Sequence, residues 1–141
     1  MEPSSLSEQI LFTTVRVETE DTNGQKGIGT SFIFNYNLDS KSYLFLVTNK
    51  HVVSDAEQGN LTFTVSHNNK PVLGQGFRYY FPIDFEKSWE GHPNEEIDVT
   101  VTPLVPILEK IQKAPAKVEM SPAQPFFFYF ENSQLLEIAK V

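Results

Sequence analysis

The stretch Tyr43-Leu44-Phe45-Leu46-Val47-Thr48-Asn49-Lys50-His51 decides the fold. Its first six residues form a short, continuous apolar run rich in aromatic and β-branched side chains, which is typical of a strand buried on both faces. Asn49 and Lys50 end the run, and the segment that follows is too short for a long helix. We therefore expect His51 to lie just past a buried strand, from which its ring projects into a cleft.

Short strands flank this run on both sides. A polar loop that contains Asn23-Gly24, a strong hairpin signal, separates the two strands expected before it. The pattern contains no long helix between strands, which predicts a mainly β protein with an antiparallel barrel or sandwich. The expected strands cover residues 10–18, 28–36, 43–48, 61–65 and 97–104, with weaker candidates at 72–73 and 77–81.

The bulk composition restricts the class of protein. The 141 residues are 40% hydrophobic and 21% charged, which is ordinary for one globular domain. The net charge of −7, without any run of Lys or Arg, argues against a nucleic-acid groove. The absence of cysteine excludes a disulfide, a thiolate metal site and a cysteine nucleophile. The polar start of the chain lacks a secretory signal and no apolar run could span a membrane, so we expect a cytoplasmic protein with no membrane partner.

The last third of the chain changes character. Apolar residues at helical spacing predict a helix from Leu104 to Ile111, and a short final helix is expected from Gln134, capped by Asn132-Ser133. The run Phe126–Phe130 would be an aggregation hazard on an open sheet edge. We expect it to pack under the barrel or against sequence outside this chain, and it favours self-association.

Three segments in a fixed order carry a resemblance to a known family. They are Gly27-Ile28-Gly29-Thr30-Ser31-Phe32-Ile33-Phe34, then Leu46-Val47-Thr48-Asn49-Lys50-His51-Val52-Val53, then Ile97-Asp98-Val99-Thr100-Val101. Together they resemble the first barrel of trypsin-like (chymotrypsin-fold) serine peptidases, in particular the cysteine-free, bacterial-type members. The resemblance spans roughly residues 10–104.

The resemblance implies a single domain over residues 1–141. Residues 10–104 would form an antiparallel six-stranded barrel of Greek-key type, the first half of a trypsin-like double barrel. Residues 104–141 would form an extension of short helices and loops that leads toward a second barrel, which this sequence does not contain.

The resemblance also implies that His51 is the general base and Asp98 the acid that orients it. An imidazole is neutral near pH 7 yet able to take a hydroxyl proton, and a carboxylate can fix its tautomer and stabilise the imidazolium. The two residues are 47 positions apart and would meet only when the barrel closes. We expect Asp98 to begin a strand whose Val99 and Val101 anchor it in the core.

Gly27 and Gly29 would let backbone approach closely where a side chain would block it. They do not form a dinucleotide-binding motif, because no third glycine and no helix follow. His67 and His92 are expected to be exposed loop residues.

Other chemistries have less support in the sequence. A metal site built from the three histidines and Asp98 lacks supporting ligand spacing, so we expect no metal and no cofactor. Glu95-Glu96 is interpreted as a solvated acidic turn, because nothing else in the sequence supports glycosidase chemistry.

The family takes its nucleophile and oxyanion hole from the second barrel, at a Gly-[Asp/Asn]-Ser-Gly motif, and no serine of this sequence lies in that pattern. The chain alone is therefore not expected to cleave peptide bonds. Three accounts stay open. The chain is a piece of a complete peptidase acting on a peptide or protein substrate, a catalytically inactive β-barrel that serves as a binding module, or a half-enzyme whose second barrel comes from another chain. We favour the first.

Overall fold

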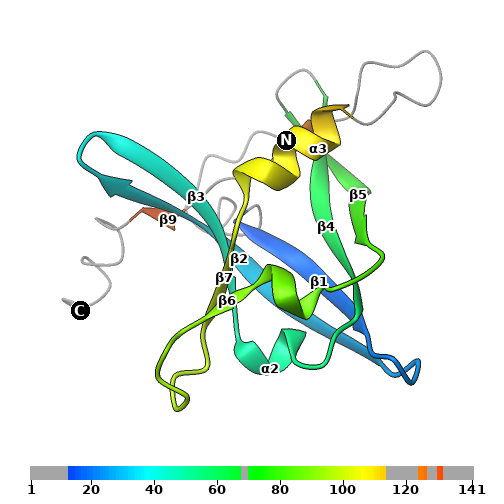
Figure 1. The fold of residues 1–141 in the computed structure, drawn as a ribbon. Coiled ribbons are helices and arrows are strands. Elements are labelled where there is room, and N and C mark those ends of the chain that lie inside the picture. Colours follow the sequence, from blue (N-terminus) through cyan, green and yellow to red (C-terminus); the bar gives the residue numbers. More distant parts are fainter. Residues whose placement is uncertain (1–12, 68–69, 114–123, 127–129, 132–141) are drawn as a thin grey trace.

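A computed structural model describes residues 13–67, 70–113, 124–126 and 130–131 (Figure 1). Most of these residues form antiparallel strands, which confirms the mainly β fold predicted from alternating apolar residues. In chain order the elements are β1 (Thr14–Glu20), β2 (Lys26–Leu38), β3 (Lys41–Thr48), α2 (Lys50–Val53), β4 (Gln58–His67), β5 (Lys70–Phe81), the 3₁₀ turn η1 (Glu86–Ser88), β6 (Glu90–Gly91), β7 (Thr100–Pro103), α3 (Val105–Lys113), β8 (Gln124–Phe126) and β9 (Phe130–Glu131).

The strands follow the order β5-β4-β1-β2-β3-β7-β6 in one sheet, and every neighbouring pair on this path is antiparallel. Strands β1, β2 and β3 form two consecutive hairpins, and β4 returns to lie beside β1. This 4-1-2-3 order defines a Greek key, as expected. The path holds seven strands rather than six because β6, only two residues long, pairs with β7, while β8 and β9 pair with β4 and β2 off the path.

In the described part of the chain, the hydrogen-bonded path ends at β5 and β6 and does not close into a ring. A chain of aromatic rings crosses this gap instead. The ring centroids of Tyr79 and Phe81 are 5.0 Å apart, those of Phe81 and Phe85 5.1 Å, and those of Phe85 and Trp89 5.9 Å, all with edge-on geometry. Each such pair contributes about 0.5–1.5 kcal/mol beyond its area burial. Because Trp89 directly precedes β6, these rings connect the two ends of the sheet.

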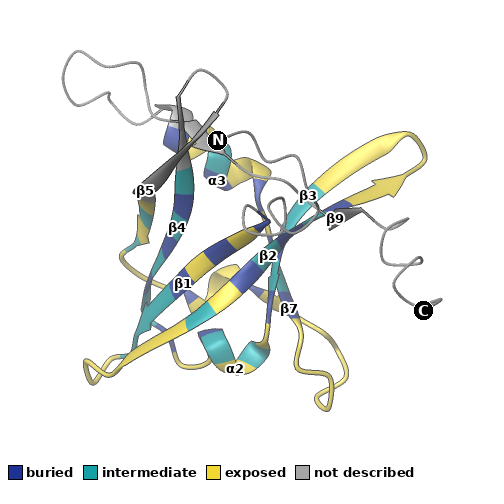
Figure 2. Ribbon diagram, turned by 180° about the vertical axis from the view of Figure 1, so that it is seen from behind, coloured by how far each residue is buried: buried dark blue, intermediate teal, exposed yellow. Residues whose placement is uncertain are grey.

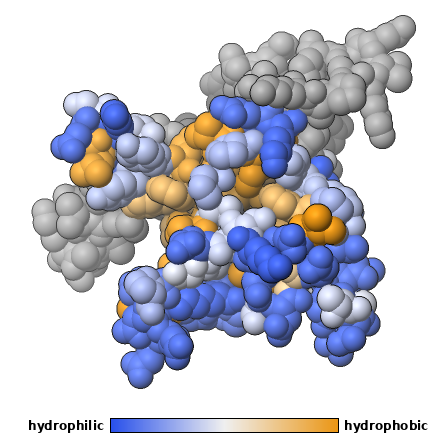
Figure 3. Space-filling model, in the orientation of Figure 1, coloured by the Kyte–Doolittle hydropathy of each residue, from blue (hydrophilic) through white to orange (hydrophobic). Residues whose placement is uncertain are grey.

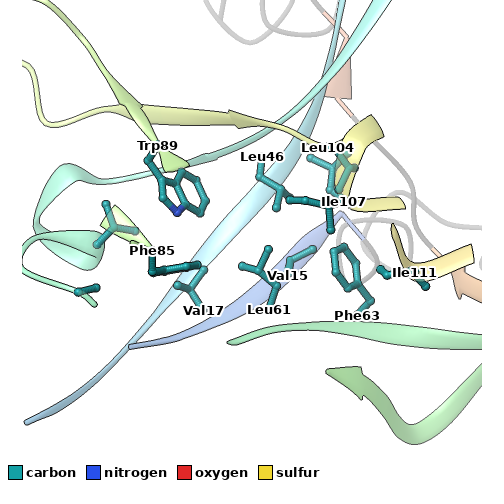
Figure 4. Packing of buried hydrophobic residues seen from close by; sticks show 13 residues of the cluster. Val15, Val17, Leu46, Leu61, Phe63, Phe85, Trp89, Leu104, Ile107 and Ile111 are labelled. Atoms are coloured by element: carbon teal, nitrogen blue, oxygen red, sulfur yellow. The ribbon is translucent and has the colours of Figure 1, made fainter. Parts of the chain in front are cut away.

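One hydrophobic core lies inside the curled sheet (Figure 4). Every second residue of a strand points inward, as the two-residue period of a strand requires. Helix α3 covers one end of the core and confirms the helix predicted from Leu104 to Ile111. The buried apolar residues are Val15, Val17, Ile33, Leu46, Val53, Ala56, Leu61, Phe63, Phe85, Trp89, Leu104, Ile107 and Ile111.

Strand β7 differs from the prediction. It begins at Thr100, so Asp98 lies in the preceding loop and not in the strand. The expectation that two valines anchor Asp98 in the core is wrong, because Val99 is 38% exposed while Thr100 and Thr102 are buried. The inward position suits threonine because the Thr102 hydroxyl donates to the backbone carbonyl of Ser88 at 2.8 Å, which satisfies its buried polar group.

The weak strand candidates at 72–73 and 77–81 belong to one long strand, β5. The pairing of β4 with β5 changes register between two neighbouring residues of β4: Thr64 faces Gly76, whereas Val65 faces Val72. This irregularity accommodates the extra residues of β5 that separate the two candidates. The predicted helix from Gln134 and the middle of the run Phe126–Phe130 lie outside the described residues. Figure 2 shows that the far end of the β2–β3 hairpin is exposed. No helix in the described ranges is long and apolar enough to cross a membrane.

Candidate active site

The structure brings His51 and Asp98 together, as the order of the motifs predicted. His51 lies in α2, which begins directly after β3, and Asp98 lies in the loop between β6 and β7. The ring Nδ1 of His51 is 2.5 Å from Oδ2 of Asp98, and the backbone N–H of His51 donates to Oδ1 of the same carboxylate at 3.0 Å. Both carboxylate oxygens are therefore bound to one residue, which fixes the plane of the carboxylate. The catalytic role of the pair stays a prediction.

Helix α2 is held against the sheet by two contacts. A Cβ atom added at Gly29 would lie 2.5 Å from Cγ1 of Val52, so only glycine lets α2 lie this close to β2. Val53 points into the core and is 3% exposed. These contacts leave the His51 side chain on the outer side of the turn. Gly27 also accommodates a close approach, here to the side chain of Thr19.

The pKa of the Asp98 carboxyl lies below its ordinary value. The hydrogen bond from the His51 ring is the largest cause; partial burial acts in the opposite direction, and the backbone N–H groups and the charge of His51 add smaller effects. Asp98 is therefore an anion at neutral pH and can only accept hydrogen bonds. It follows that the proton of the neutral His51 ring lies on Nδ1 and that Nε2 carries the basic lone pair.

The side chain of His51 is accessible to solvent. Among the described residues, no hydrogen bond involves its Nε2 atom. The side chains of His51 and Asp98 are 73% and 46% exposed. The end of the molecule around α2 and the β6–β7 loop is mostly hydrophilic in Figure 3. The pair is thus a largely solvent-exposed acid–base group.

Two residues that sequence reasoning missed also contact the loop that carries Asp98. Asn49 Nδ2 donates to the backbone carbonyl of Asp98 at 2.9 Å. Lys50 Nζ donates to the carbonyls of His92 at 2.7 Å and Asn94 at 3.1 Å. Both residues stand in the motif that precedes His51, but nothing in the sequence indicates which carbonyls they would reach, because that depends on the path of the loop.

A hollow of about 250 Å³ lies beside the ring, between α2 and the β1–β2 hairpin. Its hairpin wall is well ordered by hydrogen bonds, since Oδ1 of Asp21 accepts from the backbone N–H groups of Asn23 and Gln25, and Gly24 has a φ of +79°. The turn predicted at Asn23-Gly24 is confirmed. The hollow is lined by Thr19, Asp21, Gln25, Lys26, Gly27, Ile28, His51, Val52, Ser54 and Ala56.

The other sequence candidates do not join the site. His92 is exposed in a loop, as expected, and its Nδ1 accepts the backbone N–H of Asn94. His67 ends strand β4 and does not lie in a loop. Glu95 and Glu96 are exposed, in agreement with a solvated turn. The described ranges contain no group of three His, Cys, Asp or Glu side chains that could hold a metal ion.

Within the described part of the chain, no serine hydroxyl is hydrogen-bonded to the His51 ring; Ser54 lines the same hollow, but there the structure shows only its backbone N–H donating to Lys50. The site therefore consists of a base and its orienting acid. Comparison of the chain with protein-family models, curated proteins and solved structures finds no match. The resemblance to trypsin-like peptidases therefore rests on the order of the motifs in this sequence.

Proposed function

We propose that this chain is the N-terminal part of a trypsin-like serine endopeptidase domain, with His51 as general base and Asp98 as the acid that orients it. The observation that carries the proposal is the carboxylate of Asp98, bound through both oxygens to His51, while Nε2 of the exposed ring has no hydrogen bond among the described residues. An ordinary surface ion pair needs one contact between the two charged groups, whereas here the backbone N–H of His51 also binds the second carboxylate oxygen.

The proposed chemistry moves one proton at Nε2 of His51. As a serine hydroxyl attacks the carbonyl carbon of a peptide bond, Nε2 takes the hydroxyl proton, and Asp98 stabilises the imidazolium that forms. The same proton then passes to the leaving amine, which gives an acyl-enzyme. Water repeats the cycle and releases the acid. Positioned acid–base catalysis of this kind contributes about 10²–10⁴-fold to the rate.

The serine and the oxyanion hole would come from a second barrel in the same or another chain. Two facts support this division. No serine of the sequence lies in the family's Gly-[Asp/Asn]-Ser-Gly pattern, and the His51 ring is exposed enough to receive a partner. The substrate class that follows from the family is the peptide bond of a peptide or protein.

Fluorophosphonate labelling tests the proposal. The 141-residue chain alone should not be labelled, whereas the natural gene product that contains it, or the assembly it forms, should be labelled at a serine. His51→Ala in that protein should slow labelling by about 10²-fold or more. Lys87→Ala is the control, because Lys87 is exposed and, among the described residues, forms its ion pair with Asp84, and it should label normally. Labelling that survives His51→Ala would contradict the proposal.

The lack of a serine partner for His51 in the described residues favours a second candidate, a catalytically inactive β-barrel that binds a protein. In that case His51→Ala should leave capture of the partner unchanged, and the natural gene product should not react with the probe. The two measurements together separate the candidates, because only the peptidase requires the imidazole.

A further inference from the structure

The loop between β6 and β7 places Asp98 against His51, yet few hydrogen bonds within the loop hold the loop itself in position. All residues from His92 to Ile97 are exposed. Inside the loop, the N–H of His92 donates to the carbonyl of Val99 and the N–H of Ile97 to the carbonyl of Asn94. Among the described residues, the only hydrogen bonds from the rest of the protein to the His92–Ile97 segment come from Lys50.

The geometry of Lys50 suits this contact. Its ammonium donates to two carbonyls two residues apart, those of His92 and Asn94, and so spans the turn between them. Gly91 makes room for the lysine, because a Cβ atom there would lie 3.1 Å from Cε of Lys50. The loop also carries the carboxylates of Glu95 and Glu96, and a cation beside it reduces their repulsion with Asp98.

We infer that Lys50 is a positioning residue, whose ammonium holds the loop that places Asp98 against His51. Lys50 and His51 are adjacent in α2, and His51 binds the Asp98 carboxylate. Any movement of the loop away from Lys50 therefore also moves Asp98 away from the His51 ring. The position directly before the histidine is unspecified in the motif that the chain resembles, so this role belongs to the present sequence. Its consequence for peptide hydrolysis rests on the function proposed above, whereas its effect on Asp98 does not.

The experiment is an NMR titration of the Asp98 carboxyl in the 141-residue chain, together with the solvent exchange of the His51 Nδ1 proton. Lys50→Met removes the donors but keeps an unbranched stem, whereas Lys50→Arg keeps the charge and the donors. Lys87→Met is the matched control, because Lys87 is 80% exposed and, among the described residues, forms its ion pair with Asp84 alone.

In Lys50→Met we expect the pKa of Asp98 to rise toward its ordinary value, because the hydrogen bond from His51 is the main cause of its depression. The Nδ1 proton should exchange roughly tenfold faster, as for a loop that opens more often after losing a charge-assisted hydrogen bond. Lys50→Arg should restore most of both values and Lys87→Met should match the unmodified chain. A merely structural lysine would alter thermal stability and leave these two quantities unchanged.

A folded Lys50→Met chain with an unchanged Asp98 pKa and unchanged proton exchange would overturn the inference. If Lys50→Met does not fold, Lys50→Gln decides, because it keeps an unbranched polar side chain but lacks the ammonium, and an unchanged Asp98 pKa there would also overturn it. Fluorophosphonate labelling reports on the peptidase proposal separately. A raised Asp98 pKa in a natural gene product that cannot be labelled would keep the positioning role and remove the peptidase.

Discussion

Replacing Gly29 by alanine should move α2 and with it the base of the site. An alanine Cβ would lie 2.5 Å from Cγ1, 2.9 Å from Cγ2 and 3.3 Å from Cβ of Val52, whereas ordinary contacts are 3.4–4 Å. Rotation of the valine cannot relieve this, because a β-branched side chain keeps a methyl group in most directions. The helix must therefore shift away from β2.

The expected cost combines two opposing effects. Overpacking of this kind costs about 1–3 kcal/mol. Alanine in a strand is favoured over glycine by about 0.5–1 kcal/mol, and Gly29 does not have the positive φ that would cancel this gain. The net loss of stability should be about 1–2 kcal/mol. Urea unfolding followed by the fluorescence of the single tryptophan, Trp89, which is 8% exposed, measures it.

A double-mutant cycle identifies the cause. Val52→Ala alone should cost about 1 kcal/mol, because the valine is only partly buried. In the Val52→Ala background, Gly29→Ala should cost almost nothing, since both Cγ atoms are gone and only the Cβ of residue 52, at 3.3 Å, remains close. The coupling energy should therefore be about 1–2 kcal/mol. Additive effects, within about 0.5 kcal/mol, would refute the argument that Gly29 allows α2 to pack closely against β2.

Two further outcomes follow from the same structure. Because the pKa of folded Asp98 lies below the ordinary value of 3.8, its ionisation should stabilise the fold at neutral pH, and this contribution should disappear as the pH falls below 3.8 through the folded-state pKa. In Asp98→Asn, the decrease of the urea midpoint at acid pH should lack this contribution. A decrease identical to that of the unmodified chain would contradict the prediction. Phe85→Ala should cost about 3–5 kcal/mol by opening the gap between β5 and β6, with a red-shifted Trp89 emission. A loss below about 1 kcal/mol would show that the rings do not close the core.

The strands of this protein could be predicted because apolar residues alternate along them, and the Greek-key order followed from the resemblance. The assignment of inward residues failed at β7, where Val101 pairs with Val47 and Thr100 and Thr102 occupy the buried positions. Valine and threonine have similar strand propensities, so alternation alone cannot choose between the two registers. What decides is the Ser88 carbonyl, which provides an acceptor for a buried hydroxyl and lies 14 residues away.

The candidate site was predictable in part for a similar reason. The motif order placed a histidine after one strand and an aspartate at the start of another, and the pairing of β3 with β7 brings those two ends together. The contacts of Lys50 depend instead on the backbone carbonyls of an irregular loop. Every residue has the same backbone carbonyl, so the sequence does not indicate which carbonyls a lysine will contact.

The arrangement of the site explains how it forms without a second barrel. Three consecutive residues bind three parts of one loop: Asn49 the carbonyl of Asp98, Lys50 the carbonyls of the turn before it, and His51 the carboxylate. They are fixed by the packing of α2 on β2 and by a buried valine, all within this chain. Exposure to water, however, weakens each of these electrostatic contacts. Under the proposed function, a second barrel would therefore add the nucleophile and exclude water, whereas the orientation of the base would already be set.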